Sequence, residues 1–163
     1  MTKLRTRITD LLDRRNIPYH VLPHSEPVYT VESAAQQRGA LVEEMVKSIL
    51  LRDKKRRYVM ACIPGNARLY PKAVRSHLPE GWKRLSFASS AEVLAVTGCV
   101  QGAVAPLGLP ADIPVIFDQA IAGLNHVNIS SGDPMAGLEL DTGDLIAISG
   151  AQLAPISEPR SSD

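Results

Sequence analysis

The sequence predicts an α/β (α+β) fold in which a mixed, largely antiparallel sheet forms a partly closed barrel with surrounding helices. Helical segments separated by strand-like runs of antiparallel appearance favour this arrangement over a doubly wound sheet. The 163 residues are 45% hydrophobic and 21% charged, which suits a globular domain with a substantial core. We expect one domain over residues 1–155 and a disordered tail over 156–163, where serine and proline are frequent.

The first forty residues predict two helices and a short strand, over residues 4–15, 31–38 and 19–22 respectively. Ile8, Leu11 and Leu12 fall at helical spacing, so the first segment should be an amphipathic helix. Thr30 can cap the second helix at its N-terminus, and Gly39 suits its C-terminal end.

The middle of the chain predicts a β-hairpin, formed by two β-rich runs over residues 46–52 and 57–63. The turn between them is strongly basic and contains Arg52, Lys54, Lys55, Arg56 and Arg57. Pro71 suits the first turn of a short helix that reaches about His77.

The second half predicts one more helix and several strands. Ser89 and Glu92 have the spacing of a capping box, so a helix should run to Val96 and stop at Gly98. The expected strands span residues 114–118, 126–130, 136–140 and 144–149.

Charge is distributed unevenly along the chain. Residues 1–84 hold 17 Lys and Arg against 8 Asp and Glu, whereas residues 85–163 hold one Arg against 9 acidic residues. The basic turn, together with Lys72, Arg75 and Arg84, can bind a phosphate backbone without reading its sequence. The alternative is a solvated turn whose charges only keep a sheet edge soluble.

Several classes of protein lack their sequence signatures here. The chain contains no phosphate-binding loop, no dinucleotide fingerprint, no Gly-x-Ser-x-Gly and no histidine pair at metal-ligand spacing within a predicted helix. We therefore expect no metal and no other cofactor. Cys62 and Cys99 should be buried thiols. No run approaches the roughly 18 apolar residues of a membrane span, so we expect a soluble cytoplasmic protein without membrane contact.

Lys47 is the leading candidate for chemistry, because it lies within the apolar run Val46-Lys47-Ser48-Ile49-Leu50-Leu51. Desolvating a lysine is costly unless its ammonium meets an anion, a carbonyl or water in a cleft. Alternatively, the side chain extends along the strand to an exposed edge. Further on, the loop from Gly102 to Gly108 offers bare backbone that a ligand can approach, or forms only a rigid turn.

Two further segments have both a structural and a functional interpretation. His24 lies in a segment that is more simply a surface loop. Residues 130–133 follow a predicted strand and form a turn by default, although Ser130 and Gly132 can also present polar groups to a ligand.

Taken together, these segments resemble the YbaK/EbsC family, which is related to the editing domain inserted in bacterial prolyl-tRNA synthetases. The similarity covers about residues 5–150 in the family's order, and its pieces are HSEPVYT (24–30), VKSILL (46–51), IPGNARL (63–69), TG with GAVAPLG (97–108) and ISSG (129–132). The lysine strand combined with the Gly-x-x-x-Pro-x-Gly loop is the most specific part.

The resemblance implies a fold like that editing domain and a trans-acting aminoacyl-tRNA deacylase, which hydrolyses the ester of mischarged tRNA. The family's invariant lysine falls on Lys47 and its glycine–proline loop on Gly102 to Pro106, so we expect Lys47 and Gly102 to be catalytic. The expected substrate-binding residues are His24, Ala103, Pro106, Ser130 and Gly132. The expected tRNA-binding residues, for the acceptor stem, are Arg52, Lys54, Lys55, Arg56, Lys72 and Arg75.

The resemblance also implies that the 2′-hydroxyl of the tRNA assists the attack, and that an aminoacyl-tRNA synthetase is a candidate partner. Ser131 and Asp133 stand where the Escherichia-type pattern has a glycine and a basic residue, which leaves the edited amino acid open. Two other functions stay open as well: a catalytically silent tRNA-binding or regulatory module, and a hydrolase of another small ester or thioester.

Overall fold

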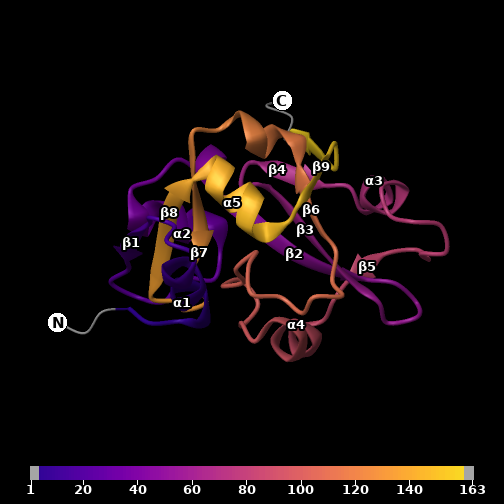
Figure 1. Ribbon diagram of the computed structural model, residues 1–163, viewed down its shortest axis with the longest axis horizontal. Coiled ribbons are helices and arrows are strands. Elements are labelled where there is room, and N and C mark those ends of the chain that lie inside the picture. The colour runs from indigo at the N-terminus through magenta and orange to yellow at the C-terminus, as the bar shows by residue number, and fades with distance from the viewer. Residues whose placement is uncertain (1–3, 160–163) are drawn as a thin grey trace.

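The structure is a computed structural model that describes residues 4–159. Its helices are α1 (Arg7–Arg14), α2 (Val31–Arg38), α3 (Pro71–Ser76), α4 (Ser90–Thr97) and α5 (Thr142–Ser149), with short 3-10 helices η1 (Val42–Glu44) and η2 (Gln119–Gly123). Figure 1 shows a three-stranded sheet with α1 and α2 in the left part of the molecule and a five-stranded sheet in the right part.

The five-stranded sheet is mixed and has the order β5 (Ser86–Phe87), β2 (Val46–Arg52), β3 (Tyr58–Pro64), β6 (Val115–Asp118) and β9 (Gln152–Ala154). Strands β2 and β3 form the predicted antiparallel hairpin, with Val46 opposite Pro64 and Arg52 opposite Tyr58. Strands β6 and β9 join in parallel. Strand β3 is central and almost wholly buried, which explains its continuous apolar run.

The three-stranded sheet is antiparallel and has the order β1 (His20–Pro23), β8 (Ala136–Asp141) and β7 (His126–Ser130). A parallel bridge between Met45 and Asn128 joins the start of β2 to β7. A third, two-stranded sheet pairs β4 (Ala67–Leu69) with β10 (Ser157–Pro159). The pairings among residues 4–159 give three sheets with free edges, so the mixed α/β fold is confirmed and the partly closed barrel is not.

Segment 144–149 is a helix, not the predicted strand. Asp141 caps α5 by accepting a hydrogen bond from the Asp144 N–H at 2.9 Å, and Gly150 ends the helix in the left-handed conformation. Leu145 is buried, and α5 packs on β8 and η2. The periodicity of the apolar run Leu145 to Ile148 fits a helix or a strand equally well. The capping residues Asp141 and Gly150 are what favour the helix.

The tail is ordered further than predicted. Ile156 is fully buried, and the N–H groups of Ile156 and Ser157 donate to Asp118 Oδ1 at 3.0 and 3.1 Å. Residues 157–159 then form β10, so the expected disorder is wrong for them. The prediction rested on composition, which does not reveal hydrogen-bond partners that are distant in sequence. The rest of that prediction, residues 160–163, lies outside the described residues.

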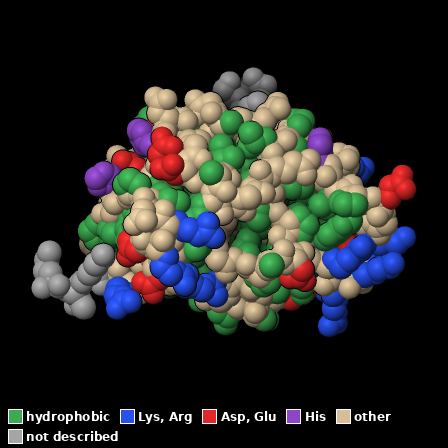
Figure 2. All heavy atoms as spheres, in the orientation of Figure 1, with side chains coloured by type: hydrophobic (Ala, Val, Ile, Leu, Met, Phe, Trp, Pro, Cys, Tyr) green, Lys and Arg blue, Asp and Glu red, His purple; other side chains and the backbone are tan. Residues whose placement is uncertain are grey.

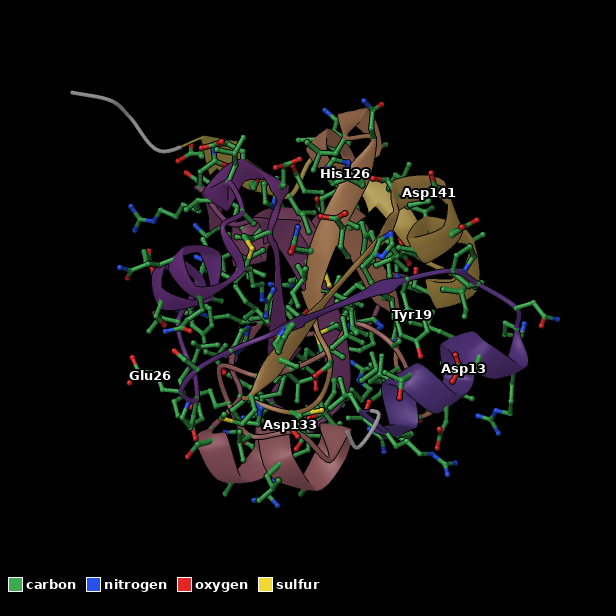
Figure 3. All side chains as sticks on the ribbon, turned by 90° about the vertical axis from the view of Figure 1, so that its left-hand side faces the viewer. Asp13, Tyr19, Glu26, His126, Asp133 and Asp141 are labelled. Atoms are coloured by element: carbon green, nitrogen blue, oxygen red, sulfur yellow. The ribbon has the colours of Figure 1, made fainter. Side chains whose placement is uncertain are left out.

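Two hydrophobic cores lie on opposite faces of hairpin β2–β3. Val46 and Leu50 contribute to the core that contains α1 and α5, whereas Ile49 and Leu51 contribute to the core beneath α3. Helix α1 is also tied to the residue before β1, since the Tyr19 hydroxyl donates to Asp13 Oδ1 at 2.9 Å (Figure 3). Burial, with the neighbouring Asp13 carboxylate, raises the pKa of Tyr19 to about 12, so this donor stays protonated at neutral pH.

Candidate active site

A cavity of about 360 Å³ lies beside β2, within the size range of small-ligand sites. Its walls come from the segment before α2, from α2 itself, from β2, from the β5–α4 region and from the loop before residue 105. The lining residues are Val28 to Glu32, Ala34, Arg38, Met45 to Leu50, Phe87, Ala88, Val93, Gln101, Gly102, Val104 and Ser130.

The cavity adjoins an unpaired stretch of the β2 edge. Strand β5 pairs only with Leu51 and Arg52, and β7 is bridged to the chain at Met45, just before β2. Between these two points the edge of β2 has no partner strand among the described residues. The Ala88 N–H donates to the Leu50 carbonyl at 3.0 Å, so the backbone groups of Leu50 point away from β3. Because alternate residues of a strand point the same way, the N–H and C=O of Ser48 also face this side. The pocket therefore has main-chain donors and acceptors in its wall.

Lys47 lines this pocket and is half-buried. It lies opposite Ile63 on β3, on the same strand face as Ile49. Its ammonium makes no hydrogen bond and no ion pair with another residue in the described range 4–159. The charge is thus available to a ligand in the cavity.

Gly102 forms part of another wall, in a loop held against the segment before α2. Its φ is +89°, and a Cβ at this position would overlap the carbonyl oxygen of Tyr29. A glycine is therefore required here because two walls of the pocket touch at this point. The sequence had instead suggested that the glycine leaves backbone bare for a ligand. The Ala103 N–H donates to Val100 O at 3.0 Å, whereas the Gly102 N–H has no partner among the described residues.

The other predicted substrate-binding residues divide into two groups. Ser130 lines the pocket. Ala103 and Pro106 are buried, Pro106 beside a separate cavity near Gly108, and Gly132 packs near Ile8. The structure therefore brings Lys47, Gly102 and Ser130 together and leaves Ala103, Pro106 and Gly132 outside the lining.

His24 also lies outside the lining, behind a residue that the sequence did not reveal. The imidazole is buried, with Nδ1 2.8 Å from the carbonyl oxygen of Pro134 and Nε2 3.0 Å from Nε of Arg38. Burial lowers the pKa of His24, so the neutral ring donates from Nδ1 and accepts from Arg38 at Nε2. Arg38 itself lines the pocket. An arginine at the C-terminal end of a helix is an ordinary favourable charge, so nothing in the sequence singles Arg38 out.

The mouth of the cavity carries two exposed aromatic side chains. Tyr29 is 53% exposed and Phe87 is 61% exposed, and both line the pocket. Glu32 is the acidic residue among the lining residues, and no histidine is among them. The described lining therefore offers cations, hydroxyls and amides more than a strong general base.

The predicted tRNA-binding residues lie at the far end of the hairpin and on α3. Lys54, Lys55 and Arg56 are exposed at the tip, and Lys72 and Arg75 are exposed on α3. Figure 2 shows Lys and Arg side chains gathered at the right of the molecule, over this end of the hairpin. Lys47 and Lys54 are seven positions apart in the sequence, which corresponds to about 23 Å of extended chain.

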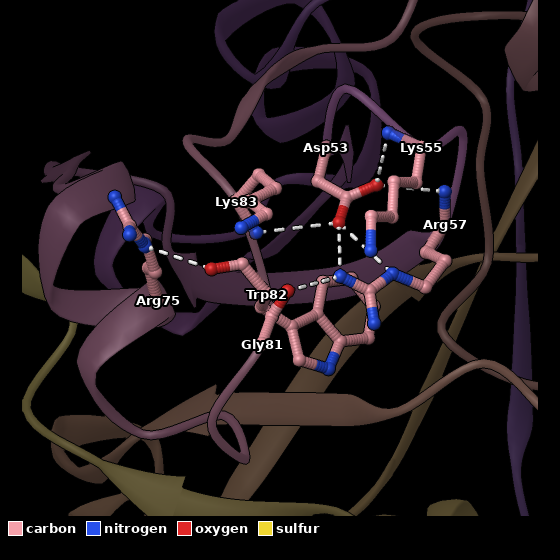
Figure 4. A network of polar contacts seen from close by, with 7 residues as sticks. All are labelled: Asp53, Lys55, Arg57, Arg75, Gly81, Trp82 and Lys83. Atoms are coloured by element: carbon pink, nitrogen blue, oxygen red, sulfur yellow. Dashed lines mark hydrogen bonds and ion pairs between the residues drawn. The ribbon is translucent and has the colours of Figure 1, made fainter.

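Asp53 builds the hairpin tip. Its buried carboxylate accepts hydrogen bonds from the backbone N–H groups of Lys55, Arg57 and Lys83. It also forms an ion pair with the Arg57 guanidinium at 2.6 Å (Figure 4). Arg57 also lies over the Trp82 ring, 4.6 Å from its centroid. Arg52 is engaged as well, since its guanidinium lies 3.2 Å from Glu92 Oε2. The tip is thus rigid, with Lys54, Lys55 and Arg56 displayed on it.

The chain is similar to several known proteins. The family described as Aminoacyl-tRNA editing domain matches residues 25–148. The chain is 30% identical over 139 residues to the prolyl-tRNA editing protein ProX of Acetoanaerobium sticklandii, covering 82% of this chain and 83% of that protein. It is 30% identical over 98 residues to a proline–tRNA ligase of Trichlorobacter lovleyi, covering 60% of this chain but only 17% of the ligase.

A solved structure shares the fold. A crystal structure described as a candidate trans-editing enzyme for prolyl tRNA synthetase superposes with a TM-score of 0.76 and 29% identity, covering 93% of this chain and 95% of that one. None of the described helices is long and apolar enough to cross a membrane.

Proposed function

The chain belongs to the aminoacyl-tRNA editing domain family, and from this premise we propose that it hydrolyses the ester bond of mischarged tRNA in trans. The observation that carries the proposal is that one pocket contains Lys47, the Gly102 N–H and the open edge of β2, and that neither Lys47 nor the Gly102 N–H has a partner among the described residues. The pocket accepts the aminoacyl group and the terminal adenosine. We place the reaction in the cytoplasm, where charged tRNA is used.

Hydrolysis of an aminoacyl ester requires few catalytic groups from the protein. An aminoacyl ester is already activated, so the site needs to position a nucleophile and stabilise the oxyanion that develops on the carbonyl. The Gly102 N–H is an uncommitted donor for that oxyanion, and the Lys47 ammonium orients the ester or the ribose. No histidine is among the described lining residues. We therefore assign the orientation of the attacking water to the substrate's own 2′-hydroxyl group.

The surroundings of the pocket suit the 3′ end of a tRNA. Tyr29 and Phe87 offer exposed ring faces at the mouth, on which unpaired bases can stack. The basic hairpin tip and α3 lie further out, where they attract the phosphates of the acceptor stem. A synthetase that releases the mischarged tRNA is a candidate partner, since the chain matches a segment of a proline–tRNA ligase.

Turnover on defined substrates tests the proposal. The purified protein is mixed with tRNA charged with alanine, cysteine, serine or threonine, and loss of the ester is followed. Hydrolysis of at least one of these is expected, and a Lys47→Ala protein prepared in the same way controls for contaminating activity. Binding of charged tRNA without turnover would instead indicate a silent binding module. Hydrolysis of free esters or thioesters alone would indicate a different hydrolase.

A further inference from the structure

Arg38 is a partly buried cation that pairs with no carboxylate among residues 4–159. Its Nε donates to His24 Nε2 at 3.0 Å, and its Nη1 lies 3.9 Å from Met45 Sδ, a weak acceptor. Its Nη2 has no hydrogen-bond partner among the described residues, and the side chain lines the pocket. The outer edge of the guanidinium is therefore free to bind a ligand.

The fold makes room for this guanidinium. A Cβ on Gly137 of β8 would overlap Nε, Cζ and Nη2 of Arg38, so one face of the guanidinium lies directly against the bare backbone of that glycine. His24 is itself fixed by the Pro134 carbonyl at 2.8 Å. Two neighbours thus hold Arg38 in one orientation, yet neither neutralises its charge.

A fixed, uncompensated guanidinium favours an anion, because arginine binds carboxylates and phosphates through two parallel N–H groups. At the 3′ end of a tRNA charged with a neutral amino acid, the ester, ribose and base are uncharged and the α-amino group is positive. That amino group would be repelled by Arg38 and attracted by the exposed Glu32 carboxylate in the same pocket. The phosphodiesters are the only anions left in the substrate.

We propose that Arg38, oriented by His24 and Gly137, binds the 5′-phosphate of the terminal adenosine of the substrate. This inference rests on the proposed function and assigns Lys47 to the ester and ribose instead of that phosphate. Arg38 is then a binding residue, and His24 and Gly137 are positioning residues.

Two minimal substrates separate this role from others. One is the 3′-aminoacyl ester of adenosine 5′-monophosphate, and the other is the same ester of adenosine. In Arg38→Gln, KM for the phosphorylated ester should rise roughly 10- to 100-fold, the effect of losing hydrogen bonds to a charged group, while kcat changes little. Values for the unphosphorylated ester should stay within about twofold of the parent.

Gly137→Ala gives an independent variant that keeps the positive charge. The added methyl group displaces a flexible side chain instead of backbone, so the protein should fold and show the same phosphate-selective rise in KM. Arg14→Gln, at the exposed end of α1, is the matched control and should leave both substrates unaffected. An equal loss on both substrates in Arg38→Gln, or no loss on either, would overturn the assignment.

Binding of adenosine 5′-monophosphate and of adenosine, measured by calorimetry, does not depend on turnover. The parent should bind the phosphorylated compound more tightly, and Arg38→Gln should lose that preference. Equal affinities in the parent would overturn the inference even if deacylation is observed. If the parent hydrolyses no ester but keeps the preference, the proposed function fails while the phosphate site stands.

Discussion

Lys47 is the residue on which the proposed chemistry most directly depends, and its replacement is the first prediction. Lys47→Ala should lower kcat/KM for a mischarged tRNA by roughly 100-fold or more, since an oriented cation beside the ester is lost. The melting temperature should stay the same or rise, because the ammonium is half-buried and unpaired among the described residues. Kinetics and thermal melting measure the two effects. Parental turnover in the folded variant would remove Lys47 from the mechanism.

The second prediction concerns the contribution of the buried Asp53 carboxylate to stability. Asp53→Asn should lower the free energy of unfolding by about 2–3 kcal/mol, because several charge-assisted hydrogen bonds are weakened at once. The Arg57 guanidinium and backbone N–H groups hold the pKa of Asp53 at about 2, against an ordinary 3.8, despite the opposing effect of burial. The charged form is therefore favoured by folding, and its contribution is present at neutral pH and lost as the pH falls through about 2.

Denaturant unfolding of both proteins at several pH values checks this expectation. The difference between the parent and Asp53→Asn should be full at pH 7 and shrink between about pH 4 and about pH 2. A difference that does not change with pH would mean that packing, and not the charge, makes Asp53 important.

At the scale of elements, the loop that contains Gly102 gives the third prediction. Gly102→Ala should lower both activity and stability, because the new Cβ meets the Tyr29 carbonyl and the φ of +89° disfavours other residues. Gly150→Ala is the matched control, since its φ is +66° but nothing lies near the added carbon. The control should cost about 1 kcal/mol of stability and leave kcat/KM unchanged.

Activity and melting temperature of the two alanine variants decide the point. Equal activity in both would mean that the contact between Gly102 and Tyr29 does not shape the pocket. The sequence interpretation, in which the glycine mainly leaves space for a ligand, instead expects loss of activity with little loss of stability.

The same scale shows what the sequence could predict. Helices with explicit signals were predicted well: Thr30 and Gly39 bound α2, and Ser89 and Glu92 begin α4 with a capping box. Hairpin β2–β3 followed from its two β-rich runs. Helix α5 was missed because a short apolar run has no decisive period, and β10 because its hydrogen-bond acceptors on Asp118 are distant in sequence.

The pocket was predictable to a similar degree. Lys47 was conspicuous because a charge in an apolar strand needs an explanation. Gly102 and Ser130 were candidates from their glycine loop and turn, and the family resemblance supported both. Arg38 was not predictable from the sequence. Its unusual feature is that no carboxylate among the described residues pairs with it, and its actual neighbours are His24, just after β1, and Gly137 of β8. Its partner His24 was predicted to bind the substrate, whereas the structure places it outside the pocket lining, against Arg38.

At the scale of the whole molecule, the pocket and the basic hairpin tip lie at opposite ends of β2. Lys47 and Arg52 are five positions apart on β2, about 17 Å along the strand, so the two regions contact different parts of a bound tRNA. Arg52 is already paired with Glu92, which leaves Lys54, Lys55 and Arg56 as the uncommitted charges of the tip. Ester hydrolysis and recognition of the acceptor stem should therefore be separable by mutation and by salt.

The last prediction uses that separation. Replacing Lys54 and Lys55 with Ser and Arg56 with Asn removes three exposed charges. Asn is chosen because the φ of Arg56 is +59°, a conformation that Asn tolerates. KM for charged tRNA should rise. The slope of log affinity against log salt should flatten by about 2–3, because binding releases roughly one counterion fewer for each phosphate contact that is lost. Hydrolysis of an aminoacyl-adenosine should hardly change, since it lacks those phosphates.

Salt titrations of tRNA binding and of aminoacyl-adenosine hydrolysis test this expectation in parallel. Thermal melting should show an intact fold, because the Asp53 carboxylate still receives its hydrogen bonds from the Arg57 guanidinium and the backbone. If the triple variant keeps the parental slope and affinity, the tip is a solvated turn that only protects a sheet edge. If both substrates lose activity together, the tip acts on the pocket through the length of β2, and the two ends of the strand are not independent.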